Sequence, residues 1–207
     1  MKLYQLPQSN HCLNVRLVAH EVGEKLELIN IDFFGGETQK PEYLRKNPNG
    51  RIPTLEDGDF VLWESNAITA YLATLHPEKG LLPTNAQERA DVDRWLHWQS
   101  AHLTPAFVSV LYERVLKKFK NEGEPDERVV EVSLQNLTRF LGVLNQHLEG
   151  RQFLCNKLSI ADFAIAATLS PRRAAQIDLA PYSAVTTWLG HIESRESWKK
   201  NIWPAFA

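Results

Sequence analysis

A change of pattern near residue 80 constrains the fold of this chain more than any other feature of its sequence. Before that point, short apolar runs typical of strands alternate with segments of helical spacing, from "KLYQL" and "NVRLVAHEVG" to two runs around Asp57-Gly58 and "SNAITAYLATLH". After Ala86 we find no convincing strand pattern, and the periodicity predicts helices in residues 86–119, 127–148, 160–169 and 185–192. The order β-α-β-α-β-β-α predicts an α/β domain with a mixed sheet in residues 1–78, followed by an all-α domain in residues 86–207.

Local signals predict where several of these elements begin and end. The apolar spacing starts the first helix at Asn14, and Gly23 is expected to end it. The Asp57-Gly58 pair favours a hairpin, and Pro105 predicts a kink or break in the long helical segment. Ser159 and Asp162 form the Ser-x-x-Asp signature of a capped helix start, so we interpret Asp162 as structural.

The composition argues against several classes of function. Lys and Arg number 23 and Asp and Glu 25, so the net charge of −2 gives no reason to expect nucleic acid or an anionic membrane as a partner. No apolar run approaches the roughly 18 residues of a spanning helix, and the N-terminus lacks a signal-peptide apolar region, so we expect a cytoplasmic protein. The seven His residues are scattered, and we expect no metal site.

Two segments carry a family resemblance. The segment "NPNGRIPTLEDGDFVLWESNAITAYL", residues 47–72, resembles the glutathione-binding segment of soluble glutathione S-transferases, and "SIADFAIAA", residues 159–167, resembles the capped helix of their helical domain. The resemblance implies a thioredoxin-like N-terminal domain that carries glutathione as co-substrate. It also implies a helical domain that shapes a pocket for an apolar electrophile, and a homodimer. The implied enzyme transfers an alkyl or aryl group to glutathione, as in detoxification.

The resemblance also implies which residues contact glutathione. Ile52-Pro53 would form the family's cis peptide and leave the Ile52 backbone free to pair with the cysteinyl backbone of glutathione. Ser65 can cap the following helix, whose free N–H groups would hold the γ-glutamyl carboxylate, while Glu64 would meet the ligand's ammonium. From the residues alone, Pro53 could be a simple turn and Glu64 a solvated hairpin residue. Where related proteins carry a His-Lys pair this chain has Thr38 and Gln39, so Lys40 and Arg51 are the candidate cations for the glycine carboxylate.

The group that meets the glutathione thiol is predicted at the end of the first strand. "SNHCLNVR", residues 9–16, resembles the Ser-x-x-(Ser/Cys)-x-x-Val run of the serine-type, theta-like classes, which places Ser9 on the catalytic serine. The alternative is that Ser9 only caps a helix or closes a turn. Cys12 is a less favoured reactive centre, His11 is expected to cap the helix or face solvent, and Tyr4 lies inside the strand.

The second substrate and the overall activity are less constrained. Four residues of the segment 86–119 are candidate walls of the electrophile pocket: Trp98, His102, Phe107 and Tyr112. Besides the transferase, two alternatives stay open. One is a non-catalytic adaptor or regulatory protein with this fold, and the other is a glutathione-dependent reductase or peroxidase that uses Cys12.

Overall fold

The computed structural model describes residues 1–206; Ala207, the last residue of the predicted helical domain, lies outside them. The N-terminal part is a sheet of four strands in the order β2-β1-β3-β4, where β1 and β2 are parallel and the other pairs are antiparallel. Its elements are β1 (Lys2–Gln5), α1 (Asn10–Val22), β2 (Glu27–Asn30), α2 (Pro41–Leu44), β3 (Thr54–Asp57), β4 (Phe60–Trp63) and α3 (Ser65–Leu75). The predicted thioredoxin-like arrangement, with a mixed sheet, is confirmed.

Helix α1 starts earlier than the apolar spacing predicts. Ser9 is its N-cap, and Gly23, with φ of 84°, ends it in the left-handed region as predicted. The helix begins with the polar residues Asn10 and His11, so the apolar spacing of Val15, Leu17 and Val18 misses its start, although burial already begins at Cys12. The predicted hairpin is present, because β3 and β4 pair directly on either side of residues 58–59.

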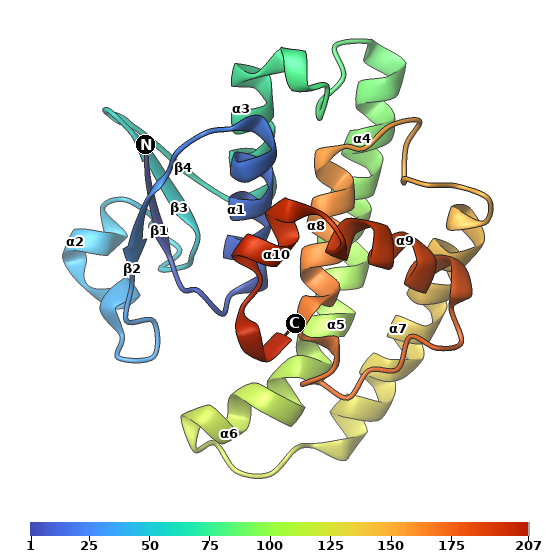
Figure 1. The fold of residues 1–207 in the computed structure, drawn as a ribbon. Coiled ribbons are helices and arrows are strands. Elements are labelled where there is room, and N and C mark those ends of the chain that lie inside the picture. Colours follow the sequence, from blue (N-terminus) through green and yellow to red (C-terminus); the bar gives the residue numbers. More distant parts are fainter. Residues whose placement is uncertain (207) are drawn as a thin grey trace.

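The rest of the chain is helical (Figure 1), with the sheet on one side of the molecule and the helices on the other. The main helices are α4 (Ala86–Trp98), α5 (Thr104–Leu111), α6 (Lys117–Lys120), α7 (Glu127–Leu148), α8 (Ile160–Leu169), α9 (Ser183–Glu193) and α10 (Glu196–Asn201). Short 3-10 turns occupy Glu37–Gln39, Pro77–Lys79, Ser170–Arg172 and Pro204–Phe206. All ten residues of α8 are buried, and α1 packs against α8, α10 and α3, which joins the two halves.

Of the predicted kink or break at Pro105, the break is wrong, because the backbone stays helical through this residue. A π-helical turn, Gln99–Leu103, lies directly before α5, and the Thr104 N–H bonds the Gln99 carbonyl. Proline has no N–H and crowds the carbonyl of the preceding turn, and the wider turn accommodates both effects. A second π-helical turn, Tyr112–Leu116, joins α5 to α6. Within residues 1–206 no helix has both the length and the apolar character needed to cross a membrane.

Candidate active site

The register of the sheet brings three of the predicted glutathione-contacting segments to one edge. Tyr4 pairs with Thr54 across β1 and β3, and Thr54 pairs with Trp63 across β3 and β4. The chain that follows β1, the chain that precedes β3 and the chain that follows β4 therefore leave the sheet at the same end. These three connections carry Ser9, Ile52-Pro53 and Glu64-Ser65, respectively.

Ser9 lies in a tight turn between β1 and α1. Its backbone N–H bonds the Leu6 carbonyl at 3.0 Å, and its hydroxyl accepts the Cys12 N–H at 3.3 Å, which makes it the cap of α1. Ser9 therefore caps α1, and this finding by itself does not decide between a purely capping serine and a catalytic one. A hydroxyl that accepts one hydrogen bond still has its own proton to donate, so the cap leaves Ser9 able to bond a thiolate.

The neighbouring side chains are less suited to a reaction. Cys12 is fully buried in the first turns of α1, and burial raises the pKa of its thiol, against smaller opposing effects from Ser9, Leu6 and Arg16. A reactive cysteine requires the opposite, a lowered pKa and exposure. Burial lowers the pKa of the neighbouring His11 imidazole. Tyr4 bonds Glu56 at 3.1 Å, away from the turn.

The connection before β3 contains the predicted cis peptide between Ile52 and Pro53. The Arg51 carbonyl accepts hydrogen bonds from the Tyr43 hydroxyl at 2.7 Å and from the Asn47 side-chain amide at 2.9 Å, and these bonds hold the turn against α2. Ile52 itself makes no backbone hydrogen bond with any residue in 1–206. Its N–H and C=O are therefore free to pair with an extended ligand.

The start of α3 differs from the prediction in its cap. Glu64, not Ser65, is the N-cap, and no side chain bonds the first backbone N–H groups. Glu64 has φ of 71° and ψ of 113°, an unfavourable conformation for a residue with a side chain. The N–H groups of residues 65–67 have no acceptor in the described chain. The first i to i−4 hydrogen bond of α3 runs from the Ile68 N–H to the Glu64 carbonyl. The three N–H groups before Ile68 are therefore open to an anion.

The two candidate cations lie on the surface near this edge. The loop after β2 leads to Lys40, the residue before α2, and Arg51 precedes the cis peptide; both are exposed. Neither forms an ion pair with a described residue. Thr38 is buried, and the Gln39 amide bonds Thr38 and the Gly50 carbonyl, so these two residues hold the loop together.

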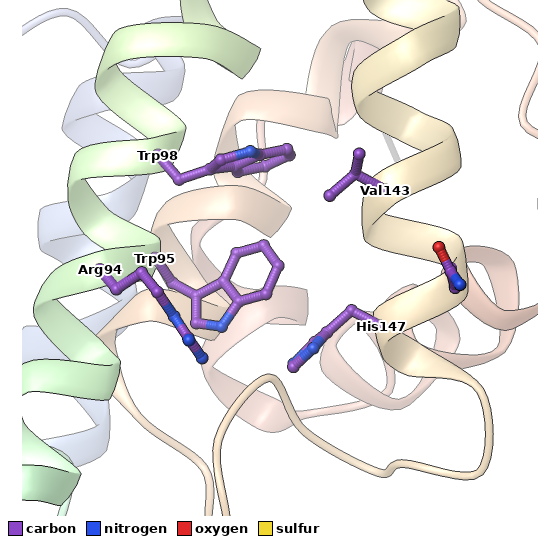
Figure 2. A pocket seen from close by; sticks show the side chains of 6 residues that line it. Arg94, Trp95, Trp98, Val143 and His147 are labelled. Atoms are coloured by element: carbon purple, nitrogen blue, oxygen red, sulfur yellow. The ribbon is translucent and has the colours of Figure 1, made fainter.

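The four predicted pocket walls lie in different environments. Phe107 is fully buried in the core, so it is withdrawn as a wall. Trp98 lines a cavity of about 410 Å³ between α4 and α7 (Figure 2), together with five residues of these two helices: Arg94, Trp95, Val143, Gln146 and His147. None of the six belongs to the first 80 residues. His102 is exposed, with its ring 5.3 Å from that of Phe140, and the Tyr112 hydroxyl bonds Glu122.

Comparison with known proteins decides the family. The glutathione S-transferase N-terminal domain family matches residues 1–74, and the corresponding C-terminal domain family matches residues 110–200. The chain belongs to the soluble glutathione S-transferases. A probable glutathione S-transferase, GSTF2, of Oryza sativa subsp. japonica is 33% identical over 205 residues, which cover 97% of this chain and 94% of that protein. Glutathione S-transferase D7 of Anopheles gambiae is 35% identical over 189 residues, which cover 90% of this chain and 83% of that protein.

Solved transferase structures share the whole fold. Glutathione transferase F2 of Populus trichocarpa superimposes with a TM-score of 0.89 at 27% identity, covering 96% of this chain and 95% of that one. A delta-class glutathione transferase of Nilaparvata lugens gives a TM-score of 0.85 at 31% identity, covering 97% of this chain and 92% of that one. The predicted family, enzyme class and fold of this transferase are therefore confirmed, while its serine-type subclass stays a proposal.

Asn66, next to Ser65 at the start of α3, makes structural contacts that sequence reasoning missed in this transferase. Its side-chain oxygen accepts from the Asn14 amide at 3.1 Å, and its side-chain nitrogen donates to Gln99 at 3.0 Å, so it ties the start of α3 to α1 and to the π-helical turn. The side-chain oxygen of Asn14, which contacts Asn66, is buried without a partner in the described chain, as is the side-chain nitrogen of Asn10 one helical turn earlier. An amide placed directly after Ser65, inside an apolar helix, was the available signal.

Proposed function

We propose that this transferase binds glutathione at the edge where β1, β3 and β4 meet their connecting loops, and conjugates its thiolate to apolar electrophiles. The observation that carries the proposal is the meeting of three kinds of unsatisfied group at one edge. These are the Ser9 O–H, the Ile52 backbone pair and the three open N–H groups of α3. Each matches one part of a γ-glutamyl-cysteinyl-glycine peptide.

Each group has a distinct task in this proposal. The open N–H groups of α3, at the positive end of the helix dipole, hold the γ-glutamyl carboxylate, and the Glu64 carboxylate pairs with the ammonium. The Ile52 N–H and C=O pair with the cysteinyl backbone as a short added strand. Lys40 and Arg51 are the cations for the glycine carboxylate, since both are exposed and without an ion-pair partner in residues 1–206.

The chemistry follows from the thiol's acidity. A free thiol has a pKa near 8.5, so only a few per cent is thiolate at neutral pH. The Ser9 O–H, beside the N-terminus of α1, donates a hydrogen bond to the sulfur and favours the thiolate. The thiol proton leaves to solvent, and the thiolate attacks the electrophilic carbon. A carbon–sulfur bond forms as the leaving group departs with its electron pair.

The electrophile site is the less constrained half of the proposal. His102 and Tyr112 retain exposed or half-buried surface on the long helical segment, which supports an electrophile site there. Trp98 lines the cavity of Figure 2 together with Val143, so it supports a contact surface instead. The complete burial and raised thiol pKa of Cys12 count against the reductase or peroxidase alternative.

The test is a pH titration of the thiolate absorbance of bound glutathione, in the native protein and in Ser9→Ala. We expect a thiol pKa well below that of free glutathione, raised again by the substitution while glutathione still binds. Binding without a lowered pKa would reject the role of Ser9, and no binding at all would favour the adaptor.

We also propose a homodimer. Val132 and Val143 are 53% and 45% exposed on one face of α7, and Val143 lines the cavity of Figure 2, which supports a contact surface along this face. Sedimentation velocity of Val143→Asp should give a monomer. Leu28→Asp, which changes a residue 46% exposed on the edge strand β2, should leave the dimer intact.

A further inference from the structure

Arg16 is a charged residue on the buried side of α1. Its exposed fraction is 7%, although it lies in the middle of an otherwise apolar stretch of the helix. It follows Ser9 by seven residues, which is about two helical turns, so its side chain lies on the same face as the start of the helix. Long side chains of a helix lean toward its N-terminus, which brings the guanidinium toward the Ser9 turn.

The contacts of Arg16 are all with neutral acceptors. One guanidinium nitrogen bonds the side-chain oxygen of Gln5 at the end of β1. The other donates to the Pro7 carbonyl at 3.0 Å and to the Asn201 carbonyl at 3.1 Å. Pro7 lies inside the Leu6–Ser9 turn, so Arg16 directly holds the turn that carries the Ser9 hydroxyl. Through Asn201 it also ties this turn to the end of α10, which packs beside α1 (Figure 1).

No carboxylate of residues 1–206 pairs with Arg16. This is unusual, because a buried charge is costly unless it is paired. By contrast with Arg16, Arg195 at the same junction of α1 and α10 does have a carboxylate partner, because it forms an ion pair with Glu21 at 2.7 Å. Burial lowers the pKa of Arg16, but a guanidinium remains charged at physiological pH.

Other charges around α1 do not neutralise Arg16. Cys12, one turn earlier, is a neutral thiol because burial raises its pKa. The titratable groups on and around α1 either have partners of their own or are exposed. His20 and Lys199 are exposed. The groups with partners are Lys2 and Tyr4 with Glu56, Tyr71 with Asp57, Asp162 with Ser159 and Trp188, and Glu196 with Lys200. The positive charge of Arg16 therefore acts on the Ser9 turn with little screening.

We propose that Arg16 is a positioning residue that fixes the Leu6–Ser9 turn, and that its unpaired charge stabilises the thiolate of glutathione bound beside Ser9. The inference rests on the proposed function, because it requires glutathione at this turn. It differs from the role of Ser9 in that Arg16 acts through space and through the turn, without a bond to the sulfur.

The most direct test neutralises the charge without removing the guanidinium. Gln5→Glu places a carboxylate at the existing contact with Arg16, and Asn30→Asp makes the same charge change one contact away, on the exposed partner of Gln5. We expect Gln5→Glu to raise the thiol pKa of bound glutathione by about one unit, a tenfold loss of thiolate below that pKa. Asn30→Asp should shift it far less.

Two further variants separate charge from structure. Arg16→Lys keeps the charge but cannot bridge Pro7 and Asn201, so the thiol pKa should stay low while kcat falls. Arg16→Gln should raise the thiol pKa as Gln5→Glu does. Arg195→Gln, which removes a paired arginine from the same junction, should lower stability and leave the thiol pKa unchanged.

The outcomes distinguish this inference from the proposed function. If native protein binds glutathione without a lowered thiol pKa, the proposed activation of the thiol at this site is wrong, whatever the role of Arg16. If the native pKa is low and Gln5→Glu leaves it unchanged, the role of Arg16 is overturned while that of Ser9 stands. An equal rise in Asn30→Asp or Arg195→Gln would also overturn it, because the effect would then not depend on the unpaired charge.

Discussion

At the scale of a single residue, the Ser9 hydroxyl caps α1 and is proposed to bond the glutathione thiolate, and these two functions do not compete. It accepts the Cys12 N–H as the cap of α1, and its own proton remains available to a ligand. The sequence left a choice between a capping serine and a catalytic serine. The geometry makes the two compatible, since the same turn positions the helix and the hydroxyl.

Substitutions at Ser9 should therefore separate stability from catalysis. Ser9→Ala removes the cap and is expected to lower the free energy of unfolding by about 1 kcal/mol, whereas Ser9→Gly costs only a few tenths. Both lack the hydroxyl, so both should lose about a hundredfold in kcat. Urea unfolding and steady-state kinetics check this. Equal stability of the two variants would contradict the capping role, and full activity in either would contradict the catalytic one.

Glu64 stores backbone strain at the start of α3. Its φ of 71° is unfavourable for any residue with a Cβ, at a cost of roughly 1–3 kcal/mol. Glu64→Gly removes the strain and the carboxylate together, while Glu64→Ala removes only the carboxylate. We expect the Gly variant to be about 1 kcal/mol more stable than the Ala variant, and both to bind glutathione more weakly than native protein. Denaturant unfolding and calorimetry measure the two effects, and equal stability of the variants would remove the strain argument.

At the scale of elements, signals carried by neighbouring residues predicted the structure well. Gly23 ends α1, Asp57-Gly58 marks the hairpin, and α7 and α8 have their predicted bounds. Errors arose where tertiary contacts decide the backbone. The cap at Glu64 needs a positive φ that no local rule assigns to glutamate, and the helix continues past Pro105 because of a π-helical turn. The burial of Phe107 likewise depends on packing between distant helices.

The cap of α8 gives the element-scale prediction. The fully buried Asp162 carboxylate accepts from the backbone N–H groups of Leu154 and Ser159 at 3.0 and 2.9 Å and from the Trp188 indole at 2.9 Å. Asp162→Ala leaves these donors buried and unpaired, so we expect a loss of about 3 kcal/mol or more in unfolding free energy. Ser159→Ala removes one hydroxyl bond to the same carboxylate and should cost about 1 kcal/mol. Similar losses in both would show that the network does not depend on Asp162.

At the scale of the whole molecule, the site depends on contacts between the sheet and the helical half. Asn66 at the start of α3 bonds Gln99, and Gln99 bonds Thr168 of α8 at 2.8 Å, so a polar chain crosses the molecule. Farther along α1, Arg16 and Glu21 both reach the α10 region. The sequence indicated two domains in order, but side-chain bonds more than 30 residues apart were beyond its local patterns.

The pair formed by Glu21 and Arg195 makes the stability of this junction depend on pH. Burial alone would raise the pKa of Glu21, but hydrogen bonds from Arg195 and Ser197 outweigh it and lower the pKa. A lowered folded-state pKa means that this stabilisation is present above the ordinary carboxyl pKa, near 4.3, and is lost as the pH falls through the folded value. Glu21→Gln should therefore cost about 2 kcal/mol at neutral pH and much less at about pH 3.

The matched control for Glu21 is an ion pair of α10 that faces solvent. Glu196→Gln removes a carboxylate 3.1 Å from Lys200, where both side chains are more than half exposed, and should leave stability nearly unchanged at either pH because solvent screens this pair. Urea unfolding of the three proteins at the two pH values measures the difference. If Glu21→Gln and native protein differ equally at both pH values, the junction is held by packing and not by this charge. A convergence at low pH, absent in Glu196→Gln, would instead place the acid-sensitive link between the two halves at Glu21, because the charge of Arg195 then loses its partner.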